Sequence, residues 1–128
     1  MRKGVMRKGV MRKPITPRIH GMLDYTTSAA VTAAPYVFGF PKPARRMFHA
    51  LSASYTGLSA MTDYPLAAKR VVPFKAHGAV ELGLAALLPV APWAFGFAKH
   101  RAARNLCFGL SALTVAVAAL TDWDDDDE

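Results

Sequence analysis

Four long apolar segments dominate this sequence and constrain its fold more than any other feature. They cover residues 19–40, 44–64, 75–97 and 103–123, and each is 21 to 23 residues long. An α-helix of that length measures about 30–35 Å, which matches the thickness of the hydrocarbon core of a bilayer. The pattern therefore predicts an all-α fold, a bundle of four transmembrane helices.

The two halves of the chain match each other when one is shifted along the other. The offset is 57 for the first segment of each half and 59 for the second, and the two additional residues fall in the second hairpin loop. We infer a tandem duplication of a two-helix unit. The matching segments are RIHG (18–21) with KAHG (75–78), APYVFGF (34–40) with APWAFGF (91–97), and TDY (62–64) with TDW (121–123).

The duplication divides the chain into five parts. A basic arm, expected to be disordered, precedes the first two-helix repeat; a connecting loop precedes the second repeat; and an acidic tail ends the chain. Because each repeat crosses the membrane twice, both repeats have the same orientation and are related by a pseudo-two-fold axis along the membrane normal. The five parts are residues 1–17, 18–64, 65–74, 75–123 and 124–128.

The distribution of basic residues predicts the orientation. The side with both termini carries ten Lys and Arg residues and the other side carries six. Positive charge is enriched on the cytoplasmic side, so we expect the termini in the cytoplasm and the protein in a bacterial inner membrane. Met6 and Met11 are alternative starts to Met1, and a start at Met11 makes the count six on each side.

The formal net charge of +7 comes mainly from the basic arm, which consists of the unit MRKGV written twice and begun a third time. The arm contains no aromatic residue, so the charge does not indicate nucleic-acid binding. The arm is interpreted either as a duplication artefact or as a contact with anionic lipid headgroups. A cleaved signal peptide is excluded because the same apolar run recurs in mid-chain.

A soluble four-helix bundle is the main alternative to a membrane protein. Its helices would show a polar face at helical period. Residues 82–98 have no charged or hydrogen-bonding side chain except the Trp93 indole. The second segment is more polar, but its Ser, Thr, Gly and Ala residues also suit close contacts between membrane helices. The sequence therefore favours the membrane.

Six ionisable residues are expected to gather at one level of the bundle. His20 and Asp24 are four residues apart and share one helix face, as do His77 and Glu81. Asp63 and Asp122 end the even-numbered segments on the same membrane side. Ionisable groups at membrane depth are candidate functional sites.

Three interpretations of this six-residue group stay open. It is a structural network of acids paired with bases, or a site for a divalent metal such as Zn or Fe. The third interpretation is a relay for protons or ions, or a histidine pair that faces a cofactor. The chain has no Gly-rich phosphate loop, no GxSxG motif and no CxxC motif, which disfavours an enzyme.

The segments Ala34-Pro35-Tyr36 and Ala91-Pro92-Trp93, each followed by Phe-Gly-Phe inside a two-span unit, carry a family resemblance. The chain resembles the SPW-repeat family of small bacterial membrane proteins over residues 18–123. The Ser of the family motif is absent from both copies and the Trp from one, which makes the chain a divergent member. The resemblance implies two-span repeats and no specific activity.

These observations predict a small integral membrane protein that acts as a structural or accessory component. The alternative is a metal- or proton-handling membrane protein that uses the His/carboxylate group. The expected partners are the lipid bilayer and other membrane proteins or further copies of the chain, and nucleic acid is not among them. The substrate and the oligomeric state are left open.

Overall fold

The computed structural model describes residues 13–124, and every regular element within this range is a helix. The all-α prediction is therefore confirmed. Residues 1–12 of the basic arm and residues 125–128 of the acidic tail lie outside the described residues. The helices are α1 (Pro17–Val37), α2 (Lys42–Ala60), α3 (Phe74–Leu87), α4 (Ala91–Ala94) and α5 (Arg101–Leu120).

The prediction of a single helix over residues 75–97 is wrong. This segment forms α3, which has 14 residues, and α4, which has four. Pro89 and Pro92 lie at the break and cannot donate the backbone hydrogen bonds that would continue α3. At 1.5 Å per residue, α3 alone measures about 21 Å.

One described helix, α5, is long and apolar enough by length and composition to cross a membrane. The other long helices, α1 and α2, contain several Ser, Thr and charged residues that lower their hydropathy. The structure thus contains one candidate membrane-spanning helix within the described residues, whereas the apolar segments predict four. The four-span arrangement therefore stays a prediction.

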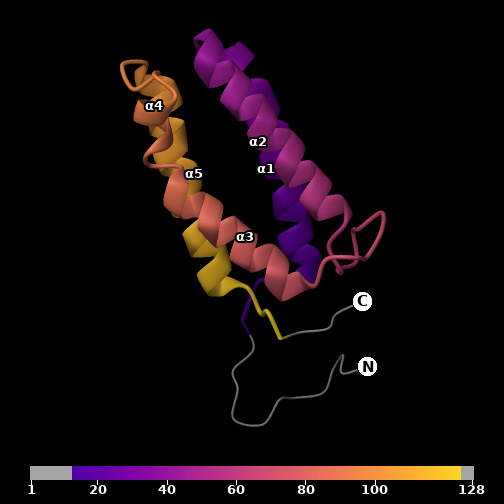
Figure 1. Cartoon of the computed structure of the whole chain (residues 1–128). Helices are drawn as coiled ribbons and strands as arrows, with labels where there is room; N and C mark the ends of the chain where they lie inside the picture. Colours follow the sequence, from indigo (N-terminus) through magenta and orange to yellow (C-terminus); the bar gives the residue numbers. More distant parts are fainter. Residues whose placement is uncertain (1–12, 125–128) are drawn as a thin grey trace.

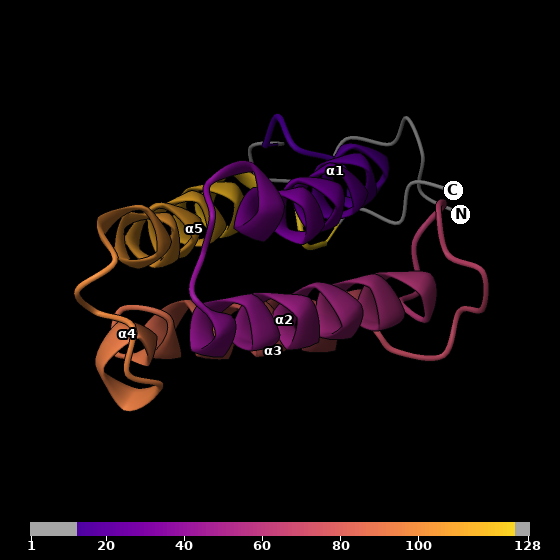
Figure 2. The same ribbon diagram turned by 90° about the horizontal axis from the view of Figure 1, so that it is seen from above.

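The helices form two hairpins that lie beside each other (Figure 1). Helix α1 packs on α2, and α5 packs on α3 and α4. Viewed from above, α2 and α3 form one layer and α1 and α5 form the other (Figure 2). The first described residues and the last described residues lie at the same end of the bundle, and we call this the terminal end.

Local sequence explains where the first hairpin begins and turns. The Thr16 hydroxyl accepts a hydrogen bond from the backbone N–H of Ile19, and Pro17 occupies the first turn, as is typical of helix N-termini. At the other end of α1, Gly39 has a φ of 60°, and the N–H of Phe40 donates to the carbonyl oxygen of Pro35 at 2.9 Å. This geometry closes the helix and favours glycine.

The second hairpin turns in the same way. Gly96 has a φ of 79°, and the N–H of Phe97 donates to the carbonyl oxygen of Pro92 at 2.8 Å. The phenylalanines that follow the two glycines, Phe40 and Phe97, are both buried. The ring centroid of Phe97 lies 6.2 Å from that of Phe48 in the first hairpin. An apolar core around these rings joins the hairpins at the end opposite the termini.

Two short backbone pairings join the hairpins at the terminal end. Ile15, which precedes α1, pairs with Thr121, which follows α5; Val72, which precedes α3, pairs with Thr62, which follows α2. Residues 13–17, predicted as part of the disordered arm, thus include a paired residue and the first residue of α1. The prediction that the basic arm is disordered is therefore wrong for Ile15 and Pro17.

Candidate metal centre

Four of the six predicted site residues meet inside the terminal end of the bundle. His20 and Asp24 lie on the first two turns of α1, and His77 and Glu81 lie at the equivalent places on α3. The spacing of four residues places each pair on one helix face. Both imidazoles are fully buried, and the two carboxylates are buried as well.

The Nε2 atoms of both histidines point at the two carboxylates. Nε2 of His20 lies 2.9 Å from Oε1 of Glu81 and 3.4 Å from Oδ2 of Asp24. Nε2 of His77 lies 2.8 Å from Oδ2 of Asp24 and 3.2 Å from Oε2 of Glu81. Each of the four side chains offers one ligand atom, and these atoms all lie within 4.8 Å of one another.

Two buried threonines hold the other side of each imidazole. Nδ1 of His20 lies 2.9 Å from Oγ1 of Thr121, and Nδ1 of His77 lies 2.7 Å from Oγ1 of Thr62. Each threonine hydroxyl donates its hydrogen to a carbonyl four residues earlier in its own helix, at 2.6 Å. The hydroxyls therefore accept from Nδ1–H, and in a neutral imidazole the lone pair lies on Nε2.

One nitrogen in this group has no hydrogen bond of acceptable geometry within residues 13–124. It is Nε2 of His77, which lies 2.8 Å from Oδ2 of Asp24 but is not aligned with it. A buried polar atom without a hydrogen bond is rare in folded proteins. Nε2 of His20, in contrast, makes an aligned contact with Oε1 of Glu81 at 2.9 Å.

Aromatic rings cover the group toward the terminal end. The ring of Trp123 lies 5.1 Å from that of His20, and the ring of Tyr64 lies 5.6 Å from that of His77, centroid to centroid. The Tyr64 hydroxyl donates to Oδ2 of Asp24 at 3.4 Å. A carboxylate oxygen only accepts hydrogen bonds, so the phenol hydroxyl is the donor in this contact.

Glycine makes the close approach of these rings possible. A Cβ atom on Gly78 would lie 2.6 Å from atoms of the Trp123 ring, and a Cβ atom on Gly21 would lie 3.3 Å from the Tyr64 ring. Each glycine directly follows one of the histidines in the sequence. The His-Gly pairs therefore place an imidazole in the site and leave room for an aromatic ring beside it.

The other two predicted site residues do not join the group. Helix α2 ends at Ala60, so Asp63 lies in the connection, where its exposed carboxylate is 3.9 Å from a guanidinium nitrogen of Arg70. Asp122 is buried, and its N–H donates to the carbonyl oxygen of Ile15 at 2.8 Å. The structure therefore brings together four of the six predicted residues. The chain is extended after α2 and α5, so the side chain of each aspartate points away from that of the threonine before it.

Thr62 and Thr121 are the site residues that sequence reasoning missed. Each directly precedes one of the two aspartates, and both belong to the matched segments TDY and TDW. The repeat of the Thr-Asp pair is a signal in the sequence, but it does not distinguish the hydroxyl from the carboxylate as the group that enters the site. Only the tertiary structure decides which residue of each Thr-Asp pair faces inward.

The arrangement can act chemically in two ways. With both Nε2 atoms unprotonated, two nitrogen and two carboxylate ligands can bind a divalent cation, whose charge the carboxylates balance. With both imidazoles protonated, the group forms two ion pairs that join α1 to α3. No protein-family model, curated protein or solved structure matches this chain.

Proposed function

We propose that this protein is an integral membrane protein that binds a divalent transition-metal ion through His20, Asp24, His77 and Glu81. The observation that carries the metal site is the convergence of four buried ligand atoms within 4.8 Å of one another. Imidazole and carboxylate ligands suit Zn and Fe, whereas Mg and Ca are bound mainly by oxygen. We therefore expect zinc or ferrous iron in preference to the alkaline-earth ions.

The distances support a compact ion. Four ligands at about 2.0–2.1 Å from a tetrahedral centre lie about 3.3 Å from one another. The contacts between nitrogen and carboxylate oxygen range from 2.8 to 3.4 Å. One ligand atom from each of the four side chains lies within 4.8 Å of the other three, so side-chain rotations that shorten the longest separations would bring these atoms to tetrahedral spacing.

The threonines support the same proposal. A histidine that ligates a metal through Nε2 commonly donates its Nδ1–H to an acceptor that fixes the tautomer and the orientation of the ring. Thr62 and Thr121 supply these acceptors for His77 and His20. The nitrogen of His77 that makes no hydrogen bond is the one that a metal would engage.

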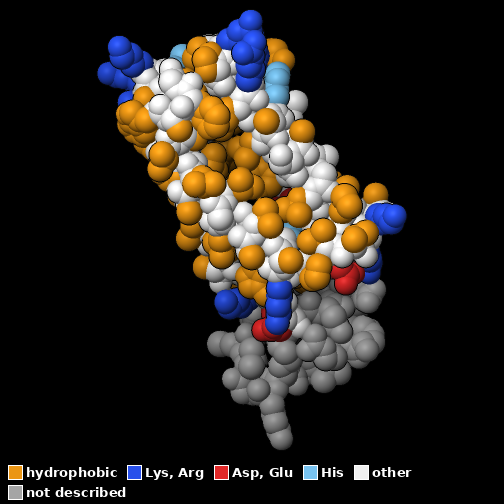
Figure 3. All heavy atoms as spheres, in the orientation of Figure 1, with side chains coloured by type: hydrophobic (Ala, Val, Ile, Leu, Met, Phe, Trp, Pro, Cys, Tyr) orange, Lys and Arg blue, Asp and Glu red, His pale blue; other side chains and the backbone are white. Residues whose placement is uncertain are grey.

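The surface supports a location in the membrane. Large apolar side chains are exposed on several helices, among them Met22, Val37, Leu87 and Val115 at 54%, 71%, 66% and 51%. Soluble monomers rarely expose extensive apolar surface. Figure 3 shows hydrophobic side chains distributed over the visible face between its two ends. We propose four membrane-crossing segments, in which α3 and α4 together form the third.

Corresponding contacts in the two hairpins support the tandem duplication. The pairs His20–Thr121 and His77–Thr62 are related by the offsets found in the sequence, and so are the backbone pairings of Ile15 and Val72. A pseudo-two-fold axis would pass between the histidines. The SPW-repeat relationship, the bacterial inner membrane and the cytoplasmic termini belong to the same proposal, and they rest on the motif and the charge count given above.

Elemental analysis tests the metal site. The full-length protein is purified from membranes in mild detergent and supplied with Zn²⁺ or Fe²⁺ after chelation. We expect about one ion per chain in the wild type and none in His20→Ala/His77→Ala. Asp63→Asn is the matched control, since it removes an exposed carboxylate outside the group and should leave the metal content unchanged. A wild type that holds no stoichiometric metal would favour the ion-pair network.

A fractionation experiment tests the membrane location separately. We expect the wild type and both variants to stay in the membrane pellet after an alkaline carbonate wash and to require detergent for extraction. A chain that is soluble without detergent would contradict the membrane location. Because the metal is measured on purified protein, the two parts of the proposal can fail independently.

A further inference from the structure

We propose that a groove between α2 and the segment formed by α3 and α4 binds one acyl chain of an anionic phospholipid, whose headgroup contacts the basic end of the bundle opposite the termini. This inference rests on the membrane location proposed above and is independent of the metal site. The groove lies between elements of the layer formed by α2 and α3, and neither His20 nor His77 lines it.

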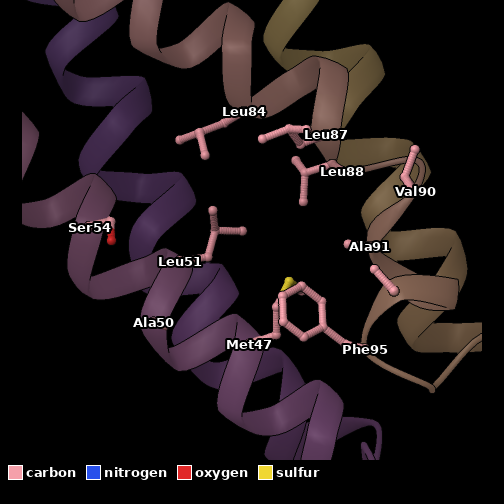
Figure 4. Close-up of a pocket in the computed structure, with 11 residues that line it drawn as sticks. Met47, Ala50, Leu51, Ser54, Leu84, Leu87, Leu88, Val90, Ala91 and Phe95 are labelled. Carbon is pink, nitrogen blue, oxygen red and sulfur yellow. The ribbon is translucent and has the colours of Figure 1, made fainter.

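The groove is apolar and large enough for a hydrocarbon chain. Its volume is about 380 Å³, within the range of small-molecule sites. Met47, Ala50 and Leu51 line it from α2, and Leu88 and Phe95 line it from the opposite side (Figure 4). Ser54 contributes the one side-chain hydroxyl among the lining residues.

The groove has a buried floor and an exposed rim. Leu51 and Leu88 are only 8% and 4% exposed, whereas Leu87 and Phe95 are 66% and 56% exposed. A hollow lined by hydrophobic side chains is visible on this face in Figure 3. Such a rim would be unfavourable in water but faces hydrocarbon in a membrane, where acyl chains are the available occupants.

Charge complementarity identifies the headgroup. The sequence contains no Asp or Glu between Asp24 and Asp63, or between Glu81 and Asp122. Each interval includes the hairpin turn at the end of the bundle opposite the termini, so the Lys and Arg residues at the helix ends there have no acidic residue nearby in sequence. The basic residues with this property are Lys42, Arg45, Arg46, Lys99, Arg101 and Arg104.

Two of these cations lie next to the groove along the chain. Arg46 is exposed and precedes Ala50 by four residues, which places both on one face of α2. Lys99 is exposed in the loop before α5 and follows Phe95 by four residues. Lys and Arg side chains are visible at this end in Figure 3. A phospholipid whose phosphate binds these cations would have its acyl chain next to the groove.

Native mass spectrometry of the full-length protein tests the inference. The protein in mild detergent is titrated with dioleoyl phosphatidylglycerol or with dioleoyl phosphatidylcholine, and the lipid bound per chain is counted. Each cation near an anionic headgroup strengthens binding by about fivefold. We expect one phosphatidylglycerol per chain, with phosphatidylcholine bound at least about tenfold more weakly.

Two variants separate the groove from the headgroup site. Ala50→Trp fills the groove and should weaken binding of both lipids, while Ala30→Trp, at an exposed site on α1, should not. Arg46→Gln/Lys99→Gln should weaken phosphatidylglycerol binding about 25-fold and leave phosphatidylcholine unchanged. Lys69→Gln, in the connection at the other end, is the control for loss of charge.

The outcomes are distinguishable. Equal binding of the two lipids, or full binding by Ala50→Trp with helical content intact, would overturn the inference. A dimer in the spectrum that excludes lipid would do the same and would assign the groove to a second copy of the chain. If the protein proves soluble without detergent, the membrane location fails; if it requires detergent but binds no phosphatidylglycerol, only this inference fails.

Discussion

Nδ1 of His77 lies 2.7 Å from Oγ1 of Thr62, and this hydroxyl donates its own hydrogen to the carbonyl oxygen of Leu58 at 2.6 Å. The contact joins the start of α3 to the end of α2, and thus joins the two hairpins. His20 and Thr121 make the equivalent contact between the start of α1 and the end of α5. Each hairpin therefore orients the imidazole of the other.

This relationship predicts that the threonines determine metal affinity without touching the metal. Thr62→Val removes the acceptor of Nδ1–H and preserves the shape of the side chain. We expect a 10- to 100-fold loss of zinc affinity, the usual order for an outer-shell partner. Competition with a chromogenic chelator measures the affinity. Thr62→Ser keeps the hydroxyl and should restore most of it.

Thr26→Val is the matched control for the threonine variants. Its hydroxyl is exposed and donates to the carbonyl oxygen of Met22 in the same helix at 2.8 Å. We expect wild-type zinc affinity in this variant. An equal loss of affinity in Thr26→Val and Thr62→Val would show that the effect comes from general destabilisation of the helices.

Binding of the ion should stabilise the fold. Zinc at 100 times its dissociation constant adds about 2.7 kcal/mol to the free energy of unfolding when it binds only the folded state. For a domain of this size, each 1 kcal/mol raises the melting temperature by about 4 °C. We therefore expect an increase of about 10 °C, measured by circular dichroism in detergent. His20→Ala/His77→Ala should show no zinc-dependent change.

Gly78→Ala should destabilise the protein because its Cβ would lie 2.6 Å from the Trp123 ring. The indole cannot move freely, since its Nε1–H donates to the carbonyl oxygen of Ala118 at 2.9 Å. Overpacking of this kind costs about 1–3 kcal/mol of the free energy of unfolding. Denaturant titration measures the loss, which should be smaller for Gly21→Ala.

Gly83→Ala is the control for this substitution within the same helix. Within residues 13–124, no heavy atom apart from the adjacent residues and the backbone of α3 lies within 4 Å of a Cβ atom at that position. The alanine should therefore raise the free energy of unfolding by about 0.5–1 kcal/mol. Equal stability of Gly78→Ala and Gly83→Ala would contradict the close packing of Trp123 against α3.

Ser111→Ala tests how the break in α3 is compensated. Pro89 has no N–H to donate to the carbonyl oxygen of Ala85, and the Ser111 hydroxyl of α5 donates to that oxygen at 2.6 Å. Loss of this donor leaves a buried acceptor unsatisfied, so we expect the free energy of unfolding to fall by about 1–3 kcal/mol.

The equivalent serine of the first hairpin provides the comparison. Ser52 donates to the carbonyl oxygen of Ser28 at 3.0 Å, but the Thr32 hydroxyl donates to the same oxygen at 2.8 Å. Ser52→Ala should therefore cost less than Ser111→Ala in a parallel denaturant titration. A larger loss for Ser52→Ala would contradict this explanation of the break at Pro89.

The sequence by itself determined the helical character of the chain and the pairing of His20 with Asp24 and of His77 with Glu81. Apolar length and the spacing of four residues are local properties, and an α-helix converts them directly into a face. The recurrence of His-Gly and Thr-Asp at fixed offsets also indicated which segments would occupy equivalent places.

Only the tertiary structure decided which of the six ionisable residues meet. Asp63 and Asp122 follow the ends of α2 and α5, where backbone pairing with Val72 and Ile15 sets the direction of each side chain. Pro89 and Pro92 break the third apolar segment locally, but the donor that satisfies the carbonyl oxygen of Ala85 at the break is the Ser111 hydroxyl of another helix. These contacts join residues far apart in the chain, and no local pattern encodes their geometry.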